Sequence, residues 1–513
     1  MRSSGVRAKI LLGERALTLD DYDSIAEGRV EVGLSDLARS RMARHRDSLL
    51  NQLASGKLIY GVNTGYGADS TRKLDAEVTR IVQRNTIVSH AVGVGPELPV
   101  RITRGMLLLK ASVFTKGFSA VRPSLVDLIC NFLNHDILPL VPEQGSLAAS
   151  GDLVPSGHLA MALIGEGEVT LSGRRMSARE ALAAAELAAF EPEEKEGLAL
   201  VNGTALTEAY ALELVILTDR LLRTADVIGA ATLQAMKGHL GAFSERAVAV
   251  RPFPGAVTVA ANMRDLCADS ELLSGSPTRV HDPYCLRCIP QVHGASRDAF
   301  LYVRRAVEIE LDACTDNPLI FEDGTWTSAG NFHAQPIGLP MDTLAVLVAE
   351  IASISQRRTQ HLVSPVYDVG LPDKLSRRPD LGSGLLMLNT TAAALVSENK
   401  ALSFPASVDS IAVDTTEDHV SMGSVAARKA MAIISNTAHV LALELVCVCQ
   451  ALDLQLPLRP STPIRALQEQ VRKVVPFADA DRAMSTEVMQ TARQILSGGI
   501  VAVVEAGLGR ALR

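Results

Sequence analysis

Three long segments of the chain contain neither glycine nor proline, the residues that most often interrupt regular structure. They span 204–228, 341–364 and 424–456. Each is much longer than an ordinary β-strand, so each predicts a helix. The runs MDTLAVLVAEI from Met341 and LALELVC from Leu441 are apolar on most sides, which is typical of helices buried inside a bundle. We therefore predict a mainly α fold, a large bundle of long packed helices with a loop-rich N-terminal section.

Polar stretches that carry glycine and proline separate these helical segments, and we expect them to hold the chemistry. They lie at 60–70, 141–157, 274–294, 321–336, 365–384 and 403–420. An acidic loop near 190–197 and a proline-containing region after Leu456 divide the chain further. We expect three lobes of one fold: an N-terminal section 1–200, a central helical core 201–456 and a C-terminal helical cap 457–513.

Composition narrows the class of protein. A chain of 513 residues is long enough to bury a sizeable core. The net charge is −7 and no Lys/Arg cluster could follow a phosphate backbone, so we expect no nucleic-acid partner. The N-terminal residues lack an apolar core of signal-peptide length, and no uninterrupted run reaches the ~20 apolar residues of a membrane span. These features predict a cytoplasmic protein without a membrane partner.

The seven cysteines include two closely spaced pairs, Cys285 with Cys288 and Cys447 with Cys449. Zinc sites usually combine two such pairs at characteristic spacing, or add paired histidines, and the sequence has neither arrangement. We therefore expect no metal site. Cys447 and Cys449 lie in an apolar helical segment, so we expect them to be reduced thiols in the core.

Residues 145–155 read GSLAASGDLVP, a run of small residues around Ala149, Ser150 and Gly151. Because Gly151 has no Cβ, its amide nitrogen can approach the Ala149 carbonyl closely. Condensation there, followed by loss of the Ser150 hydroxyl, would produce an electrophilic methylidene-imidazolone. The plainer interpretation is a turn before a helix. A nucleophilic serine is disfavoured, because Ala148 stands where a nucleophile elbow requires its first glycine.

This segment resembles the prosthetic-group loop of the histidine and aromatic amino-acid ammonia-lyases over eleven residues in order. The resemblance extends from Tyr60 to the region around Pro476. It implies a methylidene-imidazolone formed autocatalytically from Ala149, Ser150 and Gly151, with no external cofactor. It also implies a small-molecule amino-acid substrate and a homotetramer whose active sites are shared between chains.

Two motifs resemble the family's catalytic and carboxylate-binding segments. YGVNTGYG, which starts at Tyr60, is similar to the family's YGxxTGFG loop. The resemblance implies that Tyr60 removes the substrate's β-proton. DPYCLRCIPQV, at 282–292, is similar to DxYSLRCxPQV. It implies that Tyr284 assists proton handling at the departing amine and that Arg287 binds the carboxylate, for which its planar fork is suited.

Four further motifs imply contacts with the substrate or the prosthetic ring. In SHAVGVG, His90 is implied to lie against the substrate's side-chain ring. In LVNGT, Asn202 is implied to lie at the carboxylate, although an Asn-Gly turn also caps a following helix. In GNFHAQP, Asn331 and Phe332 are implied to lie beside the prosthetic ring. In EDHVSM, Glu417 is implied to accept a hydrogen bond from an imidazole N–H.

Three positions depart from the pattern of the histidine-specific members. His281 stands where glutamine is usual, Gln335 replaces a glutamate, and Thr416 replaces a glutamine. The leading prediction is a non-oxidative ammonia-lyase that converts L-histidine to trans-urocanate and ammonia. A tyrosine or phenylalanine ammonia-lyase, or a 2,3-aminomutase, is the alternative within the family. A catalytically inactive helical scaffold is the alternative outside it.

Overall fold

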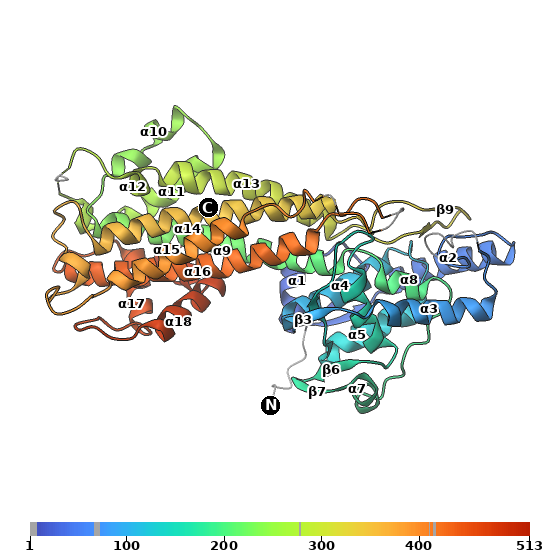
Figure 1. The fold of residues 1–513 in the computed structure, drawn as a ribbon. Helices are drawn as coiled ribbons and strands as arrows, with labels where there is room; N and C mark the ends of the chain where they lie inside the picture. The colour runs from blue at the N-terminus through green and yellow to red at the C-terminus, as the bar shows by residue number, and fades with distance from the viewer. Residues whose placement is uncertain (1–7, 66–71, 276–278, 410, 414–416) are drawn as a thin grey trace. The chain divides into compact units, whose positions relative to one another are not determined.

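The computed structural model describes the chain except for residues 1–7, 66–71, 276–278, 410 and 414–416 (Figure 1). The described chain forms two compact units. The first comprises Met1–Glu213, Arg304–Met341 and Pro405–Arg428, and the second comprises Leu214–Val303, Asp342–Phe404 and Lys429–Arg513. The units are thus assembled from segments that alternate along the sequence. The expected sections 1–200, 201–456 and 457–513 divide the chain consecutively, and that division stays a prediction.

The first unit combines short helices with small sheets. Its helices are α1 (Leu19–Ala26), α2 (Asp36–Ala54), α3 (Ala76–His90), α4 (Val100–Thr115), α5 (Pro123–His135), α6 (Leu153–Leu163), α7 (Ala178–Ala184) and α8 (Glu196–Val201). Its strands are β1 (Lys9–Leu12), β2 (Glu31–Leu34), β3 (Val94–Glu97), β4 (Ile137–Pro139), β5 (Pro142–Gln144), β6 (Glu168–Leu171), β7 (Arg174–Ser177), β8 (Leu319–Ile320) and β9 (Trp326–Thr327). β1 pairs with β2 in parallel, and β3 pairs with β5 in an antiparallel ladder. β6 is the central strand of a three-stranded antiparallel sheet, with β4 on one side and β7 on the other. Four helix starts are fixed by side-chain caps, from Thr18, Ser35, Asp75 and Ser177.

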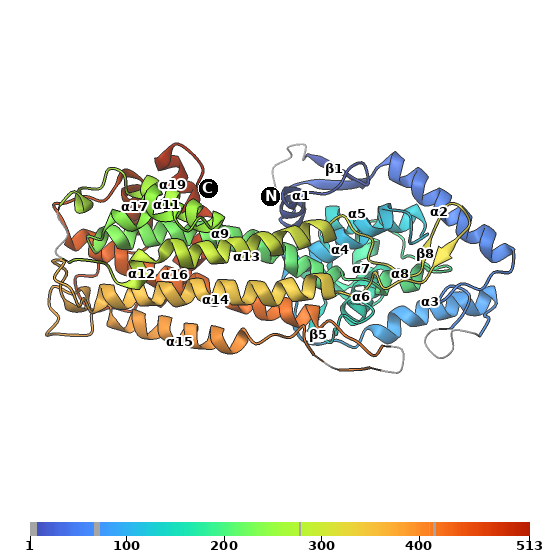
Figure 2. The same cartoon turned by 90° about the horizontal axis from the view of Figure 1, so that it is seen from above.

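Four long helices contribute residues to both units: α9 (Ala205–Ala235), α13 (Ile289–Glu310), α14 (Gln335–Val363) and α16 (Gly423–Leu454). The remaining helices of the second unit are α10 (Glu245–Ala249), α11 (Pro254–Cys267), α12 (Tyr284–Arg287), α15 (Leu386–Leu402), α17 (Thr462–Arg472), α18 (Ser485–Leu496) and α19 (Gly499–Leu508), with the 3-10 turns η2 (Leu240–Phe243), η3 (Glu271–Leu273) and η4 (Asp373–Leu375). Within this unit α14 and α15 lie side by side (Figures 1 and 2).

The predicted mainly α architecture of long packed helices is confirmed. α9, α14 and α16 cover nearly all of the three segments without glycine and proline. α14 begins earlier than that pattern indicates, at Gln335, and includes Pro336 and Pro340. Pro336 lies in the first turn, where a backbone N–H has no helical partner. Pro340 removes one backbone hydrogen bond close to the helix start, so most of the helix is unaffected.

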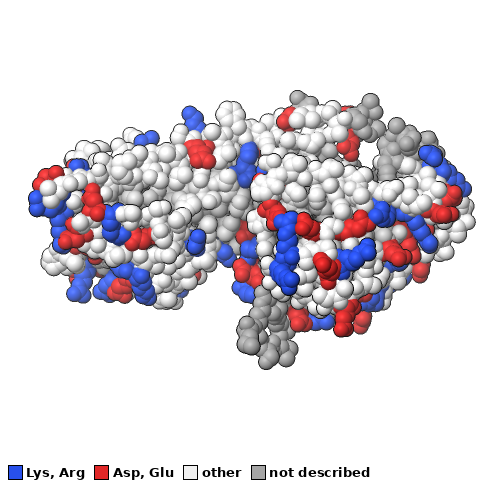
Figure 3. Space-filling view, turned by 60° about the horizontal axis from the view of Figure 1, so that its bottom comes forward, with Lys and Arg blue, Asp and Glu red and all other residues white. Residues whose placement is uncertain are grey.

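The most apolar helices form the core. In the described part of the chain, α14 and α16 are the two helices long and apolar enough to cross a membrane by length and composition, but 67% and 78% of their apolar windows are buried within the protein. Burial of this extent is typical of core helices. Cys447 and Cys449 are fully buried free thiols in α16, as predicted. On the face drawn in Figure 3, basic side chains are interspersed with acidic ones.

A buried ion pair crosses the core of the second unit. Arg358 of α14 forms two hydrogen bonds to the carboxylate of Glu444 on α16, at 2.6 and 2.8 Å. Neither side chain is exposed to solvent. Thr232 and Ser355 donate their hydroxyl groups to the same carboxylate, each at 2.6 Å. The two guanidinium N–H groups and the two hydroxyl groups together offset the cost of burying the negative charge of Glu444.

We expect Arg358→Met to lower the free energy of unfolding by about 3–5 kcal/mol, because it leaves the Glu444 carboxylate buried without its cation. Urea unfolding followed by circular dichroism measures this change. The double variant Arg358→Met/Glu444→Leu is the control, and it should recover much of the loss because it removes both charges. A loss below about 1 kcal/mol in the single variant would mean that the ion pair does not hold these helices together.

Candidate active site

The Ala149-Ser150-Gly151 segment forms a tight turn between β5 and α6. Ala148 and Gly151 both have positive φ angles, of 52° and 78°. A Cβ built on Gly151 would lie 2.2 Å from the carbonyl oxygen of Gly203 and 2.6 Å from its Cα. No side chain fits there, and the φ angle also favours glycine. The backbone of 150–152 therefore lies directly against the backbone of Gly203.

Asp152 fixes the turn to the start of α9. Its carboxylate accepts hydrogen bonds from Ser146 Oγ at 2.7 Å, from the backbone N–H of Thr207 at 2.7 Å and from Thr207 Oγ1 at 3.0 Å. Its own N–H donates to the Gly203 carbonyl at 2.8 Å. The side chain is fully buried, and burial raises the pKa of this carboxyl although the hydrogen bonds oppose the shift.

A second segment, 417–424, also holds the turn. The N–H of Met422 donates to the Leu147 carbonyl at 3.0 Å, and Ser421 Oγ donates to the Ala148 carbonyl at 2.8 Å. Ala148 also belongs to a small buried apolar cluster with Ala334 and Ile337. Three segments far apart in sequence therefore enclose the Ala-Ser-Gly turn.

Glu417 lies beside the serine of the turn. Ser150 Oγ donates a 2.6 Å hydrogen bond to Glu417 Oε1, and a bond of that length to a carboxylate is charge-assisted. The contact joins the two residues on which the functional hypothesis depends most. The sequence resemblance implied a contact of Glu417 with the substrate, and this contact with Ser150 was not foreseen. A contact with an imidazole stays a prediction.

Asn202 is buried and oriented by a charged pair. Its side-chain amide donates to Asp316 Oδ1 at 3.2 Å and to the Asn317 carbonyl at 3.0 Å. Lys195 binds the other oxygen of Asp316 at 2.6 Å, with both side chains buried. The amide group of Asn202 is therefore held by the protein, and its predicted contact with a substrate carboxylate stays a prediction.

The loop that carries Tyr60 is tied to α3. Gln83 of α3 donates its amide to the Gly61 carbonyl at 3.2 Å and accepts a hydrogen bond from the N–H of Leu198 in α8 at 3.0 Å. His90 ends the same helix, where its Nδ1 lies 2.6 Å from the Thr86 carbonyl. The helix α3 therefore contacts the loop that carries Tyr60 and also carries His90 at its end.

The segment that carries Asn331, Phe332 and Gln335 contacts Ser407 and His419. His333 Nε2 lies 3.1 Å from Nδ1 of His419, and Gln335 donates its amide to the Ser407 carbonyl at 3.1 Å. Asn331 donates to the Cys314 carbonyl at 3.3 Å, and Phe332 is partly buried. In the residues that the structure describes, no group of three or more His, Cys, Asp or Glu side chains is arranged to bind a metal.

Tyr284 and Arg287 form the two ends of α12 in the second unit. The Arg287 guanidinium lies over the Tyr284 ring, with Cζ 4.8 Å from the ring centroid. Tyr284 is 72% exposed, whereas the Nε of Arg287 is buried and makes no hydrogen bond within the described residues. His281, which precedes this helix, is exposed. The Arg287 cation is thus already stacked on the face of the Tyr284 ring.

Two residues that hold the Ala-Ser-Gly turn, Asp152 and Ser421, were not predicted from the sequence. Tyr66 and Thr416 lie outside the described residues. Asp152 was not singled out in the sequence. It is the N-cap residue of α6 but makes no capping hydrogen bond there, and its partner Thr207 is distant in sequence. Ser421 likewise has no local signal, because its partner Ala148 is distant in sequence.

Comparisons with known proteins identify the family to which this chain is related. Residues 17–473 match the model of the aromatic amino acid lyase family. A protein of Alkaliphilus metalliredigens named histidine ammonia-lyase is 40% identical over 97% of this chain and 98% of its own.

Solved structures give the same result. Histidine ammonia-lyase from Trypanosoma cruzi superposes with a TM-score of 0.90 at 33% identity, covering 97% of this chain and 95% of its own. Tyrosine aminomutase from Streptomyces globisporus superposes with a TM-score of 0.93 at 31% identity, covering 99% of this chain and 100% of its own. Because the family model and the relatives span nearly all of the sequence, the chain belongs to the aromatic amino acid lyase family and is a carbon–nitrogen lyase.

Proposed function

We propose that this enzyme converts L-histidine into trans-urocanate and ammonia, with a methylidene-imidazolone made from its own Ala149, Ser150 and Gly151. The observation that carries the proposal is the contact of Gly151 with Gly203, where a Cβ would lie 2.2 Å from a carbonyl oxygen. Such a contact demands glycine at the position whose amide nitrogen has to reach the Ala149 carbonyl. The family assignment supports the same chemistry.

The residues present fit this prosthetic group. Ala149 and Ser150 lie in a tight turn between Ala148 and Gly151, which both have positive φ angles. The Ser150 hydroxyl, which has to leave during ring formation, donates a hydrogen bond to Glu417. Once formed, the group would supply an electrophilic carbon for the substrate's amine, a chemistry that ordinary side chains lack. No external cofactor is part of the proposal.

The roles of the other residues follow from their chemistry. Tyr60 removes the β-proton as general base, and Tyr284 handles the proton at the departing amine. Arg287 binds the substrate carboxylate with its planar fork, and its buried Nε is a donor available for that purpose within the described residues. Asn202 contacts the substrate carboxylate, and Asn331 and Phe332 lie beside the prosthetic ring.

The choice of histidine depends on the side-chain pocket. His90 and Glu417 offer an imidazole and a carboxylate, which suit a polar ring that carries N–H groups. The relative from Alkaliphilus metalliredigens bears the name histidine ammonia-lyase. We also propose a cytoplasmic homotetramer with sites shared between chains, as the family resemblance implies.

A tyrosine or phenylalanine lyase, or a 2,3-aminomutase, is the second candidate. Gln335 in place of glutamate and the TM-score of 0.93 with a tyrosine aminomutase favour it. NMR analysis of the products from histidine, tyrosine and phenylalanine separates the candidates. Urocanate from histidine supports the first, whereas a β-amino acid product would establish a mutase.

We expect Ser150→Ala to abolish turnover, because this change removes the β-carbon hydroxyl that has to leave when the methylidene forms. The folded protein should keep its oligomeric state in size-exclusion chromatography. Ser172→Ala, at an exposed serine in a hairpin turn, is the control and should keep full activity. Turnover by Ser150→Ala near the wild-type rate would refute the electrophile.

We expect Arg287→Lys to lower kcat/KM at least about tenfold for every amino acid tested, because an ammonium cannot make two parallel hydrogen bonds to a carboxylate. Steady-state kinetics measure the loss. Arg251→Lys is a matched control, since Arg251 also stacks on an aromatic ring in the second unit, that of Phe253. If kcat/KM is unchanged in Arg287→Lys, the carboxylate binds elsewhere.

We expect Glu417→Gln to cut histidine turnover at least about tenfold, because it removes a charge-assisted hydrogen bond worth roughly 1.5–3 kcal/mol. The mass of the variant must first be measured, because Glu417 also contacts Ser150. Glu77→Gln, at an exposed position in α3, is the control. If Glu417→Gln has formed the methylidene-imidazolone and keeps its histidine activity, the histidine assignment is contradicted. A higher activity of this variant on tyrosine would contradict it too.

A further inference from the structure

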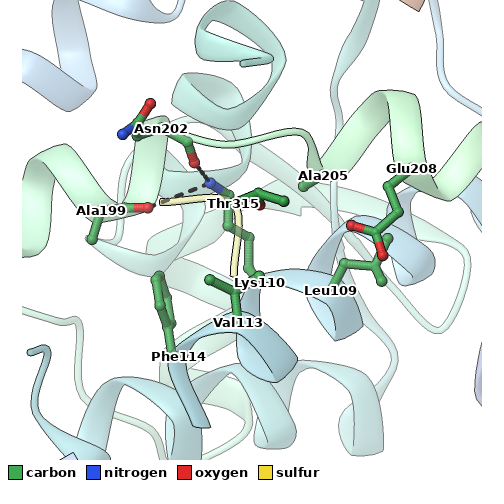
Figure 4. Close-up of a pocket in the computed structure, with 9 residues that line it drawn as sticks. All are labelled: Leu109, Lys110, Val113, Phe114, Ala199, Asn202, Ala205, Glu208 and Thr315. Atoms are coloured by element: carbon green, nitrogen blue, oxygen red, sulfur yellow. Dashed lines mark hydrogen bonds between the residues drawn. The ribbon is translucent and has the colours of Figure 1, made fainter. Parts of the chain in front are cut away.

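Lys110 is a buried cation that is linked to the Ala-Ser-Gly turn through one peptide group. It lies on α4, is 3% exposed, and directs its ammonium at the end of α8 (Figure 4). Nζ donates to the carbonyl oxygens of Asn202 and of Ala199, the latter at 3.4 Å. Both partners are backbone carbonyls, so the hydrogen bonds of this lysine serve to hold a segment of main chain.

That segment connects the lysine to Ser150. The Asn202 carbonyl and the Gly203 N–H belong to one peptide group. Its oxygen accepts from Lys110, and its N–H donates to the Ser150 carbonyl at 3.4 Å. A cation on the oxygen of a peptide polarises the group and strengthens its N–H as a donor. The charge therefore acts on the Ser150 carbonyl through a single peptide.

Keeping this charge in the interior is costly. Burial lowers the pKa of Lys110 to about 8, against the opposing effect of Asp316 and Asp152. The other buried lysine of this region, Lys195, forms a direct ion pair with Asp316. Lys110 has two neutral acceptors instead, and an apolar residue would fill the same space without the desolvation penalty.

The chemistry of ring formation supplies a use for such a charge. The Gly151 nitrogen bonds to the Ala149 carbonyl carbon, and the first water takes that carbonyl oxygen with the amide protons of Gly151 and Ser150. The second water takes the Ser150 hydroxyl and the proton on Ser150 Cα. As that proton leaves, its electron pair moves onto the Ser150 carbonyl oxygen, where a preorganised donor stabilises the negative charge.

We propose that Lys110 is a positioning residue for this maturation: its ammonium holds and polarises the Asn202–Gly203 peptide, whose N–H stabilises the Ser150 carbonyl oxygen while Ser150 loses its hydroxyl. This inference rests on the proposed function, because it assumes that the ring forms. It assigns Lys110 to the making of the electrophile and not to contact with the substrate.

The test is the intact mass of Lys110→Met, Lys110→Gln and Lys110→Arg, each checked for folding by circular dichroism. Lys116→Met is the matched control, since Lys116 ends the same helix and pairs with Asp312 near the surface. The wild type and Lys116→Met should lack two waters. Folded Lys110→Met and Lys110→Gln should retain one or both of these waters, because ring formation should be at least about tenfold slower. Lys110→Arg should form the ring at close to the wild-type rate.

Each outcome decides between the claims. If the wild type itself retains both waters, the proposed function fails whatever Lys110 does. Complete maturation of Lys110→Met or Lys110→Gln at the wild-type rate would overturn the inference alone. Failure of both neutral variants to fold would overturn it too, because Lys110 would then stabilise the core. Residual kcat in the folded variants should scale with the matured fraction while KM stays unchanged, as expected for a residue that does not touch substrate.

Discussion

The close approach of two backbone segments at Gly151 and Gly203 is the constraint on which the rest of the site depends. A Cβ at Gly151 would lie 2.2 Å from the Gly203 oxygen, and a Cβ at Gly203 would lie 2.9 Å from the Thr315 carbonyl oxygen. Both glycines have positive φ angles, so the lack of space for a Cβ and the backbone conformation both favour glycine at these positions. The contact lets the N–H of Asp152 and the carbonyl of Ser150 bond across it.

The surrounding groups keep that contact in place from several directions. The buried Asp152 carboxylate binds donors on both the turn and α9, and Ser421 donates its hydroxyl to the Ala148 carbonyl. Each of these interactions uses a short polar side chain, bonded either to a backbone group or to another short side chain. A turn held in this way loses little conformational entropy when it reacts, and such preorganisation is what intramolecular ring closure requires.

The sequence predicted the long helices well, for physical reasons. Helices without glycine and proline follow from local propensity, and α9 and α16 match their predicted segments closely. The start of α14 was missed, because Pro340 was taken as an interruption although one lost hydrogen bond near a helix start is tolerated. The hydrogen bond from Ser150 to Glu417 and the role of Lys110 could not be predicted, since they depend on contacts between segments far apart in sequence.

Tandem mass spectrometry of the peptide that contains residues 145–155, from the purified wild-type protein, tests the central claim most directly. We predict that the peptide lacks two waters and that fragment ions confine the loss to Ala149, Ser150 and Gly151. An unmodified peptide, or a loss located on other residues, would contradict the account, because the close contact at Gly151 would then serve only to pack the turn.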